Sequence, residues 1–481
     1  MIPRLRASLS VGLALLQTGI GIIGAASILS GAPAAAAPPA SHSISVGPGF
    51  SDVSPHVVVR TAANLLYAIA PDCPAYPCAG TAYTGPPNAL HVYRATAPGT
   101  PTGFGEVDAA HHPTGNIASA AAAIDGNSII HIAWLTTNGG GNVFYAPFNT
   151  ATNTWGATTT VAATNWVTAG QGEEGVALAL DSGGAPHALW SAQDAGGVLH
   201  VWYANKATGW FPQQVDNIPL GINRRAMHPT LAFRANNDLL VAWLEGTFNY
   251  QADGIIRLRG RSSAGVWGTT ETIANDTAMT TIDNGPSLLV TPDGTAHLTF
   301  LNAGTAVDGS GTAGDYIHYY YNTGGGWIAN HPGGGVQITH DPSLGLGANG
   351  ALRIYGHGWQ GGPIGGHGND LFSFEGPGGA GAWGAWTLYA TGTFDSSVST
   401  RWAQFFQSFP QTLDLAYWGD AYPNSLFVGT DPAPAVPAPL PIPRPATSVG
   451  GSGGPVNPMP HPRPSMPPIT GGTPAPLPRP R

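Results

Sequence analysis

Two groups of polar side chains in this 481-residue chain have types and spacing that suit ligand binding. Arg224, Arg225 and His228 form the densest basic group in an acidic part of the chain, and Glu173 and Glu174 precede them. Guanidinium groups form paired hydrogen bonds with carboxylates and other planar oxygen pairs. If these two segments lie in adjacent loops, they could orient an anionic or polyhydroxyl ligand.

A second group lies in the glycine-rich segment from Gly356 to Asp370, which contains His357, Trp359 and His367. Glycine lets a backbone approach a ligand closely, and an aromatic face beside polar donors suits the stacking of a sugar ring. The alternative is a packed loop in which Trp359 covers the core. Two acidic residues are further ligand-binding candidates: Glu245, expected between the second and third strands of a repeat unit, and Asp341, expected between one repeat unit and the next.

No catalytic residue, metal site or cofactor is assigned from the sequence. Histidines near carboxylates could serve acid–base chemistry or hold a metal, but their spacing matches no recognised signature. The only two cysteines, Cys73 and Cys78, lie in one segment and would form a local disulfide in an oxidising compartment. A zinc site is the alternative, but two thiols without nearby histidines suit zinc poorly.

Seven similar hydrophobic segments recur along the chain and would position these groups. Each follows a turn signal or a polar stretch and ends at or near a large hydrophobic residue. The segments are Leu65–Ile69, Ile129–Trp134, Pro186–Trp190, Leu239–Trp243, Ala296–Phe300, Leu352–Tyr355 and Leu413–Tyr417. Turn signals such as Asp125-Gly126-Asn127 tolerate the positive backbone angles of tight hairpins. The pattern therefore indicates short antiparallel strands and not helices.

The repeat length of about 56 residues suits a blade of four strands. The sequence therefore predicts an all-β fold, a single β-propeller of seven four-stranded blades. Six or eight blades remain open, because the first and last units are the least regular. Residues 42–46 alternate in polarity before the first unit, and we expect them to pair with residues 425–429 and close the ring.

The chain ends differ from the repeats. Residues 1–37 combine two arginines, a long apolar stretch and a run of alanines, which predicts a secretory signal peptide cleaved near Ala37. An uncleaved membrane anchor is the alternative, and it alone would bring contact with a membrane. Residues 38–431 would form the propeller, and the Pro/Gly-rich residues 432–481 a disordered tail. We therefore expect a secreted or cell-surface protein.

Composition narrows the choice of partner. Only 9% of residues are charged, the formal net charge is −9, and Lys206 is the only lysine. This balance disfavours nucleic acid as a partner. A glycan or a cell-envelope polymer is the expected partner.

Gly-rich turns that end in tryptophan follow the third strand of several units, as in Ser263–Trp267, Gly325–Trp327 and Gly381–Trp383. In this respect residues 42 to 430 resemble the sialidase-type propellers with BNR repeats. The resemblance implies an Asp-box of Ser or Thr, Asp, Gly and an aromatic residue, but its aspartate is missing from every copy that aligns. It would also imply three arginines that clamp a carboxylate, beside a Tyr–Glu pair and an Asp.

The arginines of the chain do not single out such a triad. Arg257, Arg259 and Arg261 alternate along one predicted strand and share a face, and an exposed stripe on an outer strand is the favoured interpretation. The leading hypothesis is therefore an exported binding module that recognises a glycan or an envelope component through loops over the propeller axis. A carbohydrate-active enzyme, either a sialidase-like glycoside hydrolase or a polysaccharide lyase, and a protein-interaction scaffold are the alternatives.

Overall fold

The structure is a computed structural model of the full chain. It describes residues 41–44, 57–72, 88–99, 103–108, 113–115, 117–136, 142–163, 175–194, 196, 198–219, 224–247, 254–275, 285–305, 313–332, 338–346, 350–358, 371–384, 387–390, 412–419 and 425–432. The predicted signal peptide, both cysteines and the Pro/Gly-rich tail beyond residue 432 lie outside these ranges. Within them, no helix has the length and apolar character to span a membrane.

Short antiparallel strands make up nearly all of the described chain, and they group into seven sheets. We number the sheets in chain order. Sheet 1 contains β2 (Val57–Arg60), β3 (Leu66–Asp72), β4 (Asn88–Arg94), β5 (Gly105–Glu106) and β6 (Thr114–Gly115). Sheet 2 contains β7 (Ile117–Ile124), β8 (Ile129–Thr136), β9 (Asn142–Asn149), β10 (Thr154–Trp155) and β11 (Thr159–Ala163). Sheet 3 contains β12 (Val176–Leu180), β13 (Pro186–Gln193), β14 (Leu199–Asn205) and β15 (Gln213–Gln214), with the short 3-10 helix η2 (Lys206–Thr208) after β14.

Sheets 4 to 6 follow the same order of strands, whereas sheet 7 joins two late strands to the first strand of the chain. Sheet 4 contains β16 (Arg224–Phe233), β17 (Leu239–Thr247), β18 (Ile255–Arg261) and β19 (Trp267–Asn275). Sheet 5 contains β20 (Ser287–Val290), β21 (Ala296–Thr305), β22 (Ala313–Asn322) and β23 (Ile328–Ala329). Sheet 6 contains β24 (Ile338–Leu346), β25 (Leu352–Gly358), β26 (Leu371–Gly376) and β27 (Thr387–Ala390). Sheet 7 contains β28 (Thr412–Gly419), β29 (Ser425–Pro432) and β1 (Ser41–Ile44).

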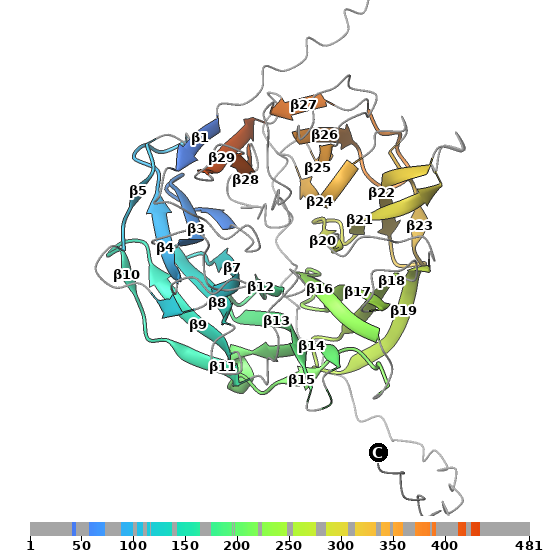
Figure 1. The fold of residues 1–481 in the computed structure, drawn as a ribbon, viewed down its shortest axis with the longest axis horizontal. Coiled ribbons are helices and arrows are strands. Elements are labelled where there is room, and N and C mark those ends of the chain that lie inside the picture. Colours follow the sequence, from blue (N-terminus) through green and yellow to red (C-terminus); the bar gives the residue numbers. More distant parts are fainter. Residues whose placement is uncertain are drawn as a thin grey trace, which may run out of the picture. The chain divides into compact units, whose positions relative to one another are not determined.

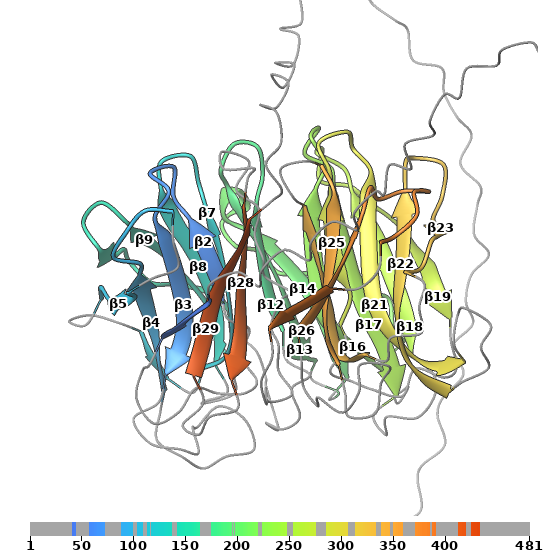
Figure 2. The same ribbon diagram turned by 90° about the horizontal axis from the view of Figure 1, so that it is seen from above.

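The sheets fan around a common centre, with their first strands innermost (Figure 1). The inner strand of each sheet contacts that of the next, from β2 to β7, β12, β16, β20 and β24 in turn. Side chains reinforce two of these contacts: the hydroxyl of Ser119 accepts a hydrogen bond from the Val176 amide, and that of Ser287 accepts one from Leu344. Figure 2 shows the strands running between two opposite ends of the sheets.

Six of the seven hydrophobic segments lie in the second strand of their sheet, as predicted, and the seventh, Leu413–Tyr417, lies in β28, the first described strand of sheet 7. The aromatic residues that end five of them, Trp134, Trp190, Trp243, Phe300 and Tyr355, are all at most 2% exposed. Neighbouring sheets cover these strands on both faces, which explains their near-continuous apolar sequence. They supply most of the core between adjacent sheets.

The predicted tight turns join the first and second strands. In sheets 2 to 5 the residue at the fourth turn position, such as Ser128 or Asn237, adopts a left-handed φ and donates its N–H to the carbonyl three residues earlier. Glycine and asparagine tolerate this conformation best. The turn signals in the sequence are thus explained by backbone geometry.

The recurring tryptophans connect neighbouring sheets. Three of the indoles donate Nε1–H to the outer edge of the preceding sheet: Trp155 to Asp108 Oδ2 at 2.8 Å, Trp267 to Gln213 Oε1 at 3.0 Å and Trp383 to the Asn330 carbonyl at 2.9 Å. The Nε1 of Trp327 is buried without a hydrogen-bond partner among the described residues. The predicted pairing of the first strand with the last is also observed. Ser41 to Ile44 of β1 lie antiparallel to Leu426 to Gly429 of β29.

Candidate functional site

The basic group around Arg224 lies within a strand. The prediction that Arg224, Arg225 and His228 occupy a connection is wrong, because all three belong to β16. Arg224 and Arg225 pair with Thr247 and Gly246 at the far end of β17. Backbone hydrogen bonding does not depend on side-chain polarity. The pairing of β16 with β17 therefore continues beyond the apolar residues to the two arginines at the start of β16.

Glu245 also lies in a strand, β17, and not in the predicted connection. Two guanidinium groups hold its carboxylate: Arg224 Nε donates to Oε1 and Arg257 Nε donates to Oε2, each at 2.8 Å. The side chains of Arg224, Glu245 and Arg257 are 22%, 11% and 25% exposed. We call these three residues the Glu245 cluster. They sit at the end of sheet 4 where β17 connects to β18, so the cluster is fixed and still reachable from solvent.

Arg257 begins a row of arginines that the sequence did identify. Arg257, Arg259 and Arg261 share one face of β18, but the interpretation as an exposed outer stripe is wrong, because all three are partly buried. Arg259 Nη1 donates to the Val215 carbonyl of sheet 3, and the Arg261 guanidinium lies 5.0 Å from the ring of Tyr203 in the same sheet. The row therefore faces the neighbouring sheet.

His228 differs from the two arginines that precede it. Its side chain is buried, at 3% exposure, and its backbone has a φ of 50°. The pairing of β16 with β17 is irregular between Met227 and Thr230, and Pro229 follows directly, so a local bulge turns His228 inward. His228 is therefore buried in a strand and does not lie in a connection, and its role in ligand binding stays a prediction.

The sequence predicts that the Glu173–Glu174 segment faces the basic group, and the structure describes only the residue that follows this segment. Both glutamates lie outside the described residues. The next residue, Gly175, is described, and a Cβ placed on it would lie 3.3 Å from Pro229 Cδ and 3.6 Å from His228 Cα. The residue that precedes β12 therefore lies against the middle of β16, at His228 and Pro229.

The candidates of sheet 6 occupy strand ends. Asp341 lies in β24 and His357 in β25, so the expectation of a connection at these two positions is wrong. His357 pairs with His340, next to irregular pairing on both sides. Trp359 and His367 lie outside the described residues. The structure does not bring this group together with the Glu245 cluster through any described side chain.

A pocket of about 500 Å³ lies at the opposite end of sheet 6, between its two hairpins. Its lining residues are Gly350, Ala351, Glu375, Gly376, Pro377 and Ala382. Glu375 is the one charged residue among them, and its carboxylate accepts from Arg353 Nη2 at 2.7 Å. The lining offers few polar groups to orient a ligand.

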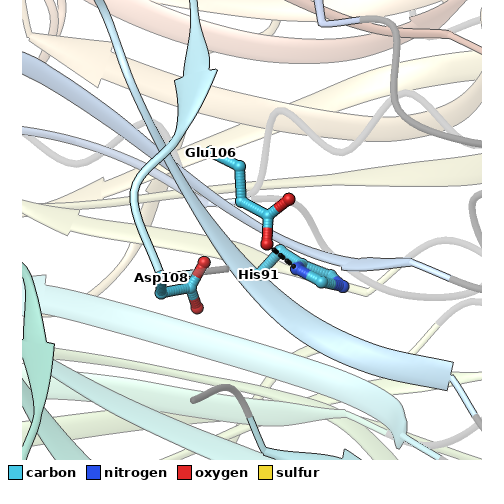
Figure 3. A group of neighbouring side chains, drawn as sticks. All are labelled: His91, Glu106 and Asp108. Carbon is cyan, nitrogen blue, oxygen red and sulfur yellow. Dashed lines mark hydrogen bonds and ion pairs between the residues drawn. The ribbon is translucent and has the colours of Figure 1, made fainter. Parts of the chain in front are cut away.

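One group that sequence reasoning missed has the residue types of a metal site. His91, Glu106 and Asp108 of sheet 1 place their ligand atoms within 4.8 Å of one another (Figure 3). His91 Nδ1 lies 2.9 Å from Glu106 Oε1. Burial raises the pKa of Asp108 above its usual range, although hydrogen bonds from the Val92 amide and the Trp155 indole oppose this rise. Since both Asp108 oxygens already accept hydrogen bonds, the group resembles a structural clasp more than a cation site.

The same clasp recurs in two other sheets, which supports this interpretation. In each copy a histidine of the third strand is followed by a residue whose amide donates to a side chain just beyond the fourth strand. The pairs are Val92 N to Asp108 Oδ1 at 3.0 Å, Val201 N to Asp216 Oδ2 at 2.5 Å and Tyr319 N to His331 Nδ1 at 3.1 Å. In sheet 5 a histidine replaces the aspartate. A role in closing the outer strand explains all three copies, whereas a metal site explains only the first.

Histidine–tyrosine pairs form a second recurring feature. His131, His187 and His297 lie 2.7, 2.6 and 2.7 Å from the hydroxyls of Tyr145, Tyr203 and Tyr319, respectively. Burial lowers the pKa of all three histidines, and that of His297 falls to about 4. The available sequence signal was the spacing of Asp125 to His131 and Asp181 to His187. These pairs are buried, so they serve packing between strands.

Comparison with known proteins supports the fold. No protein-family model and no curated protein matches the chain. Among solved structures, the BP39L lectin from Burkholderia pseudomallei superposes with a TM-score of 0.52 at 14% identity, covering 80% of this chain and 97% of the lectin. The fold is a β-propeller. An α-L-arabinanase from Penicillium chrysogenum in complex with arabinobiose is also similar, with a TM-score of 0.41 at 13% identity over 65% of this chain and 92% of the enzyme.

A further similar structure is the propeller domain of the Trilobed protease from Pyrococcus furiosus. Its TM-score is 0.41 at 9% identity, over 80% of this chain and all of that domain. The similarity to the lectin, at 14% identity, establishes the shared fold and no more. The specific resemblance to the sialidase-type propellers is not established by these structures, so it stays a prediction.

Proposed function

We propose that this chain is a carbohydrate-binding β-propeller that recognises a glycan or a cell-envelope polymer at the Glu245 end of sheet 4. The observation that carries the proposal is the carboxylate of Glu245, fixed between the guanidinium groups of Arg224 and Arg257. Such an array offers guanidinium donors and a carboxylate acceptor that hydrogen bonds hold in place. Rigid planar groups recognise the hydroxyl pairs of a sugar without a large cost in side-chain entropy.

The geometry favours binding over catalysis. A glycosidase needs one carboxyl group to protonate the leaving oxygen and a second group on the other side of the sugar. Both oxygens of Glu245 already accept hydrogen bonds from guanidinium groups, which suits orientation of a ligand better than proton transfer. The shared fold with a lectin is consistent with this role.

We also propose the finer architecture, a ring of seven blades closed by β1. The antiparallel pairing of β1 with β29 supports it, because the last sheet is then completed by the first strand of the chain. Closure of this kind protects strand edges from pairing with other molecules. Six or eight blades would need a different grouping of strands from the seven sheets of the described residues.

Export of the protein is part of the proposal. Residues 1–37 would act as a secretory signal, Cys73 and Cys78 would form a disulfide, and the Pro/Gly-rich residues 432–481 would remain disordered. The composition supports this, since few charged residues and a single lysine are compatible with an extracytoplasmic binding protein. A secreted or cell-surface location places the protein beside envelope polymers.

A glycan array tests the proposed function directly. The full chain and the Glu245→Gln variant would be compared, with Glu271→Gln as the matched control, because Glu271 is an exposed glutamate of the same sheet. Saturable binding that Glu245→Gln weakens and Glu271→Gln leaves unchanged supports the proposal. Binding that Glu245→Gln leaves unchanged would contradict the proposal and favour another site. Turnover of chromogenic sialosides or polyuronates would contradict it and favour the enzyme alternative.

A further inference from the structure

Positive charge is concentrated in sheet 4 of an otherwise acidic chain. Six of the 17 lysines and arginines lie between residues 224 and 261, whereas only three of the 26 acidic residues do. The six are Arg224, Arg225, Arg234, Arg257, Arg259 and Arg261. A local excess of one charge sign attracts ligands of the opposite sign.

Three of these arginines form a line along β18. Side chains at alternate strand positions share a face, so Arg257, Arg259 and Arg261 lie on one face of β18. Successive arginines are about 7 Å apart along the strand. Their neighbours on this face are Trp243, Val241 and Leu239 of β17, and Thr272, Thr270 and Trp267 of β19. Glu271 pairs with Leu258, so its side chain belongs to the other face. The line therefore starts at the Glu245 cluster and runs away from it.

The line of arginines faces the outer part of sheet 3. Arg259 contacts the Val215 carbonyl and Arg261 lies beside Tyr203, and both residues belong to sheet 3. The outer strand of sheet 3, β15, has only two residues, whereas β19 of sheet 4 has nine. Because β15 is much shorter than β19, sheet 3 covers only part of the face of sheet 4 that carries the arginines. All three arginines are therefore partly exposed.

Two of the guanidinium groups have no carboxylate beside them in the described part of the chain. Arg259 donates its hydrogen bonds to the carbonyls of Gly268 and Val215, and its guanidinium lies over Trp267. The Arg261 guanidinium lies 5.0 Å from the Tyr203 ring and 5.8 Å from the Trp267 ring. Its Nε is buried with no hydrogen-bond partner among the described residues. Aromatic contacts hold a guanidinium in place without neutralising its charge.

From this arrangement we propose that the arginine face of β18, beside sheet 3, binds an anionic glycan, with its carboxylate or sulfate groups against Arg259 and Arg261. This inference rests on the proposed function and names the class of its ligand. A polymer that contacts the Glu245 cluster would continue along β18 and place successive acidic groups beside successive arginines. The line lies on the third strand of one sheet and not over the axis, so it is distinct from a carboxylate clamp at the centre of a propeller.

Binding to polymers of defined charge tests the inference with the full chain. Polygalacturonate carries carboxylates and dextran sulfate carries sulfates, whereas dextran and galactan are neutral. Titrations at several salt concentrations would compare the wild type with R261Q and R259Q. K206Q is the matched control, because Lys206 is an exposed cation that follows β14 and contacts Tyr145 of sheet 2.

We expect the wild type to prefer a charged polymer, and the preference between carboxylate and sulfate identifies the acidic group. R261Q or R259Q should weaken binding of that polymer about ten-fold, since charge-assisted bidentate contacts are strong. K206Q should stay within about two-fold of the wild type, because surface charges outside a contact contribute little. Thermal melts confirm that each variant folds, and R261K separates charge from the planar fork, with an intermediate affinity expected.

The failures of the two proposals are distinguishable. The protein could bind a glycan through Glu245 and yet show no preference for acidic polymers, or R261Q and K206Q could bind equally well. Either result would overturn this inference and leave the proposed function intact. If none of the polymers binds and the glycan array is also blank, both proposals are wrong.

Discussion

His297 and Tyr319 lie side by side in the core of sheet 5, with His297 Nδ1 2.7 Å from the tyrosine hydroxyl. His297 Nε2 lies 3.1 Å from the Thr291 hydroxyl, so both ring nitrogens have partners. The histidine is 3% exposed, and this burial lowers its pKa to about 4. The pair joins the second and third strands of its sheet, and it makes the fold sensitive to acid.

The stability of the protein should therefore fall as the pH drops from about 6.5 to about 4. In that window the unfolded chain binds a proton at His297 that the folded protein does not, so the free energy of unfolding decreases with decreasing pH. The shift corresponds to an upper value of about 3 kcal/mol. Urea denaturation at pH 7 and pH 4.5 measures it. In His297→Gln this part of the pH dependence should disappear, and an unchanged slope in the variant would contradict the assignment.

Replacement of Glu245 by Gln should destabilise sheet 4. The change leaves Arg224 and Arg257 without their shared carboxylate, and loss of one partner from a partly buried ion pair costs about 1–3 kcal/mol. The side chains are partly exposed, so solvent screening favours the lower end of this range. Chemical denaturation measures the loss, and Glu271→Gln provides the exposed control. Equal stability of the two variants would show that the cluster contributes nothing to folding.

The indole of Trp155 should stabilise the contact between sheets 1 and 2. In Trp155→Phe the carboxylate of Asp108, which is 5% exposed, loses the hydrogen bond from Nε1. A buried acceptor that loses its donor costs about 1–3 kcal/mol. Phe211→Leu, at a side chain that is 70% exposed, should change the free energy of unfolding by less than about 0.5 kcal/mol. Similar melting temperatures for the wild type and Trp155→Phe would argue against the clasp.

Divalent cations should leave the stability unchanged if His91, Glu106 and Asp108 form a structural clasp. A cation that bound the folded protein would raise the Tm as its concentration increases. Thermal melts with added zinc, calcium or a chelator should therefore coincide. A cation-dependent rise in Tm that is lost in His91→Gln would identify a metal site instead.

The pairing of β1 with β29 can be tested by cross-linking. Ser43 and Phe427 are directly opposite in the register, and residues opposite each other in an antiparallel pair have Cα atoms about 4.5–5.5 Å apart, within the reach of a disulfide. The double variant Ser43→Cys/Phe427→Cys should form this bond, as detected by peptide mapping. Ser43→Cys/Tyr417→Cys should not, because Tyr417 lies one strand further away on β28. The reverse result would place the first strand elsewhere.

Much of the fold was predictable from the sequence because its signals are local. The aromatic residues of the second strands, such as Trp190 and Trp243, mark positions that are buried on both faces, and the turn residues mark where each hairpin reverses. Neither signal depends on distant parts of the chain. The repeat therefore predicted the strands, their antiparallel order and the partner of β1.

The candidate site was predicted less well, because it depends on how strands pair and how sheets face each other. The sequence identified Arg224 and Glu245, but the bond between them requires the register of β16 and β17, and the second bond requires Arg257 of β18. His228 is buried by a bulge in β16 that no sequence motif predicts. Hydrophobic periodicity determines which residues form strands, whereas register, bulges and the packing of sheet 4 on sheet 3 decide which charged groups meet, since those contacts join residues far apart in the chain.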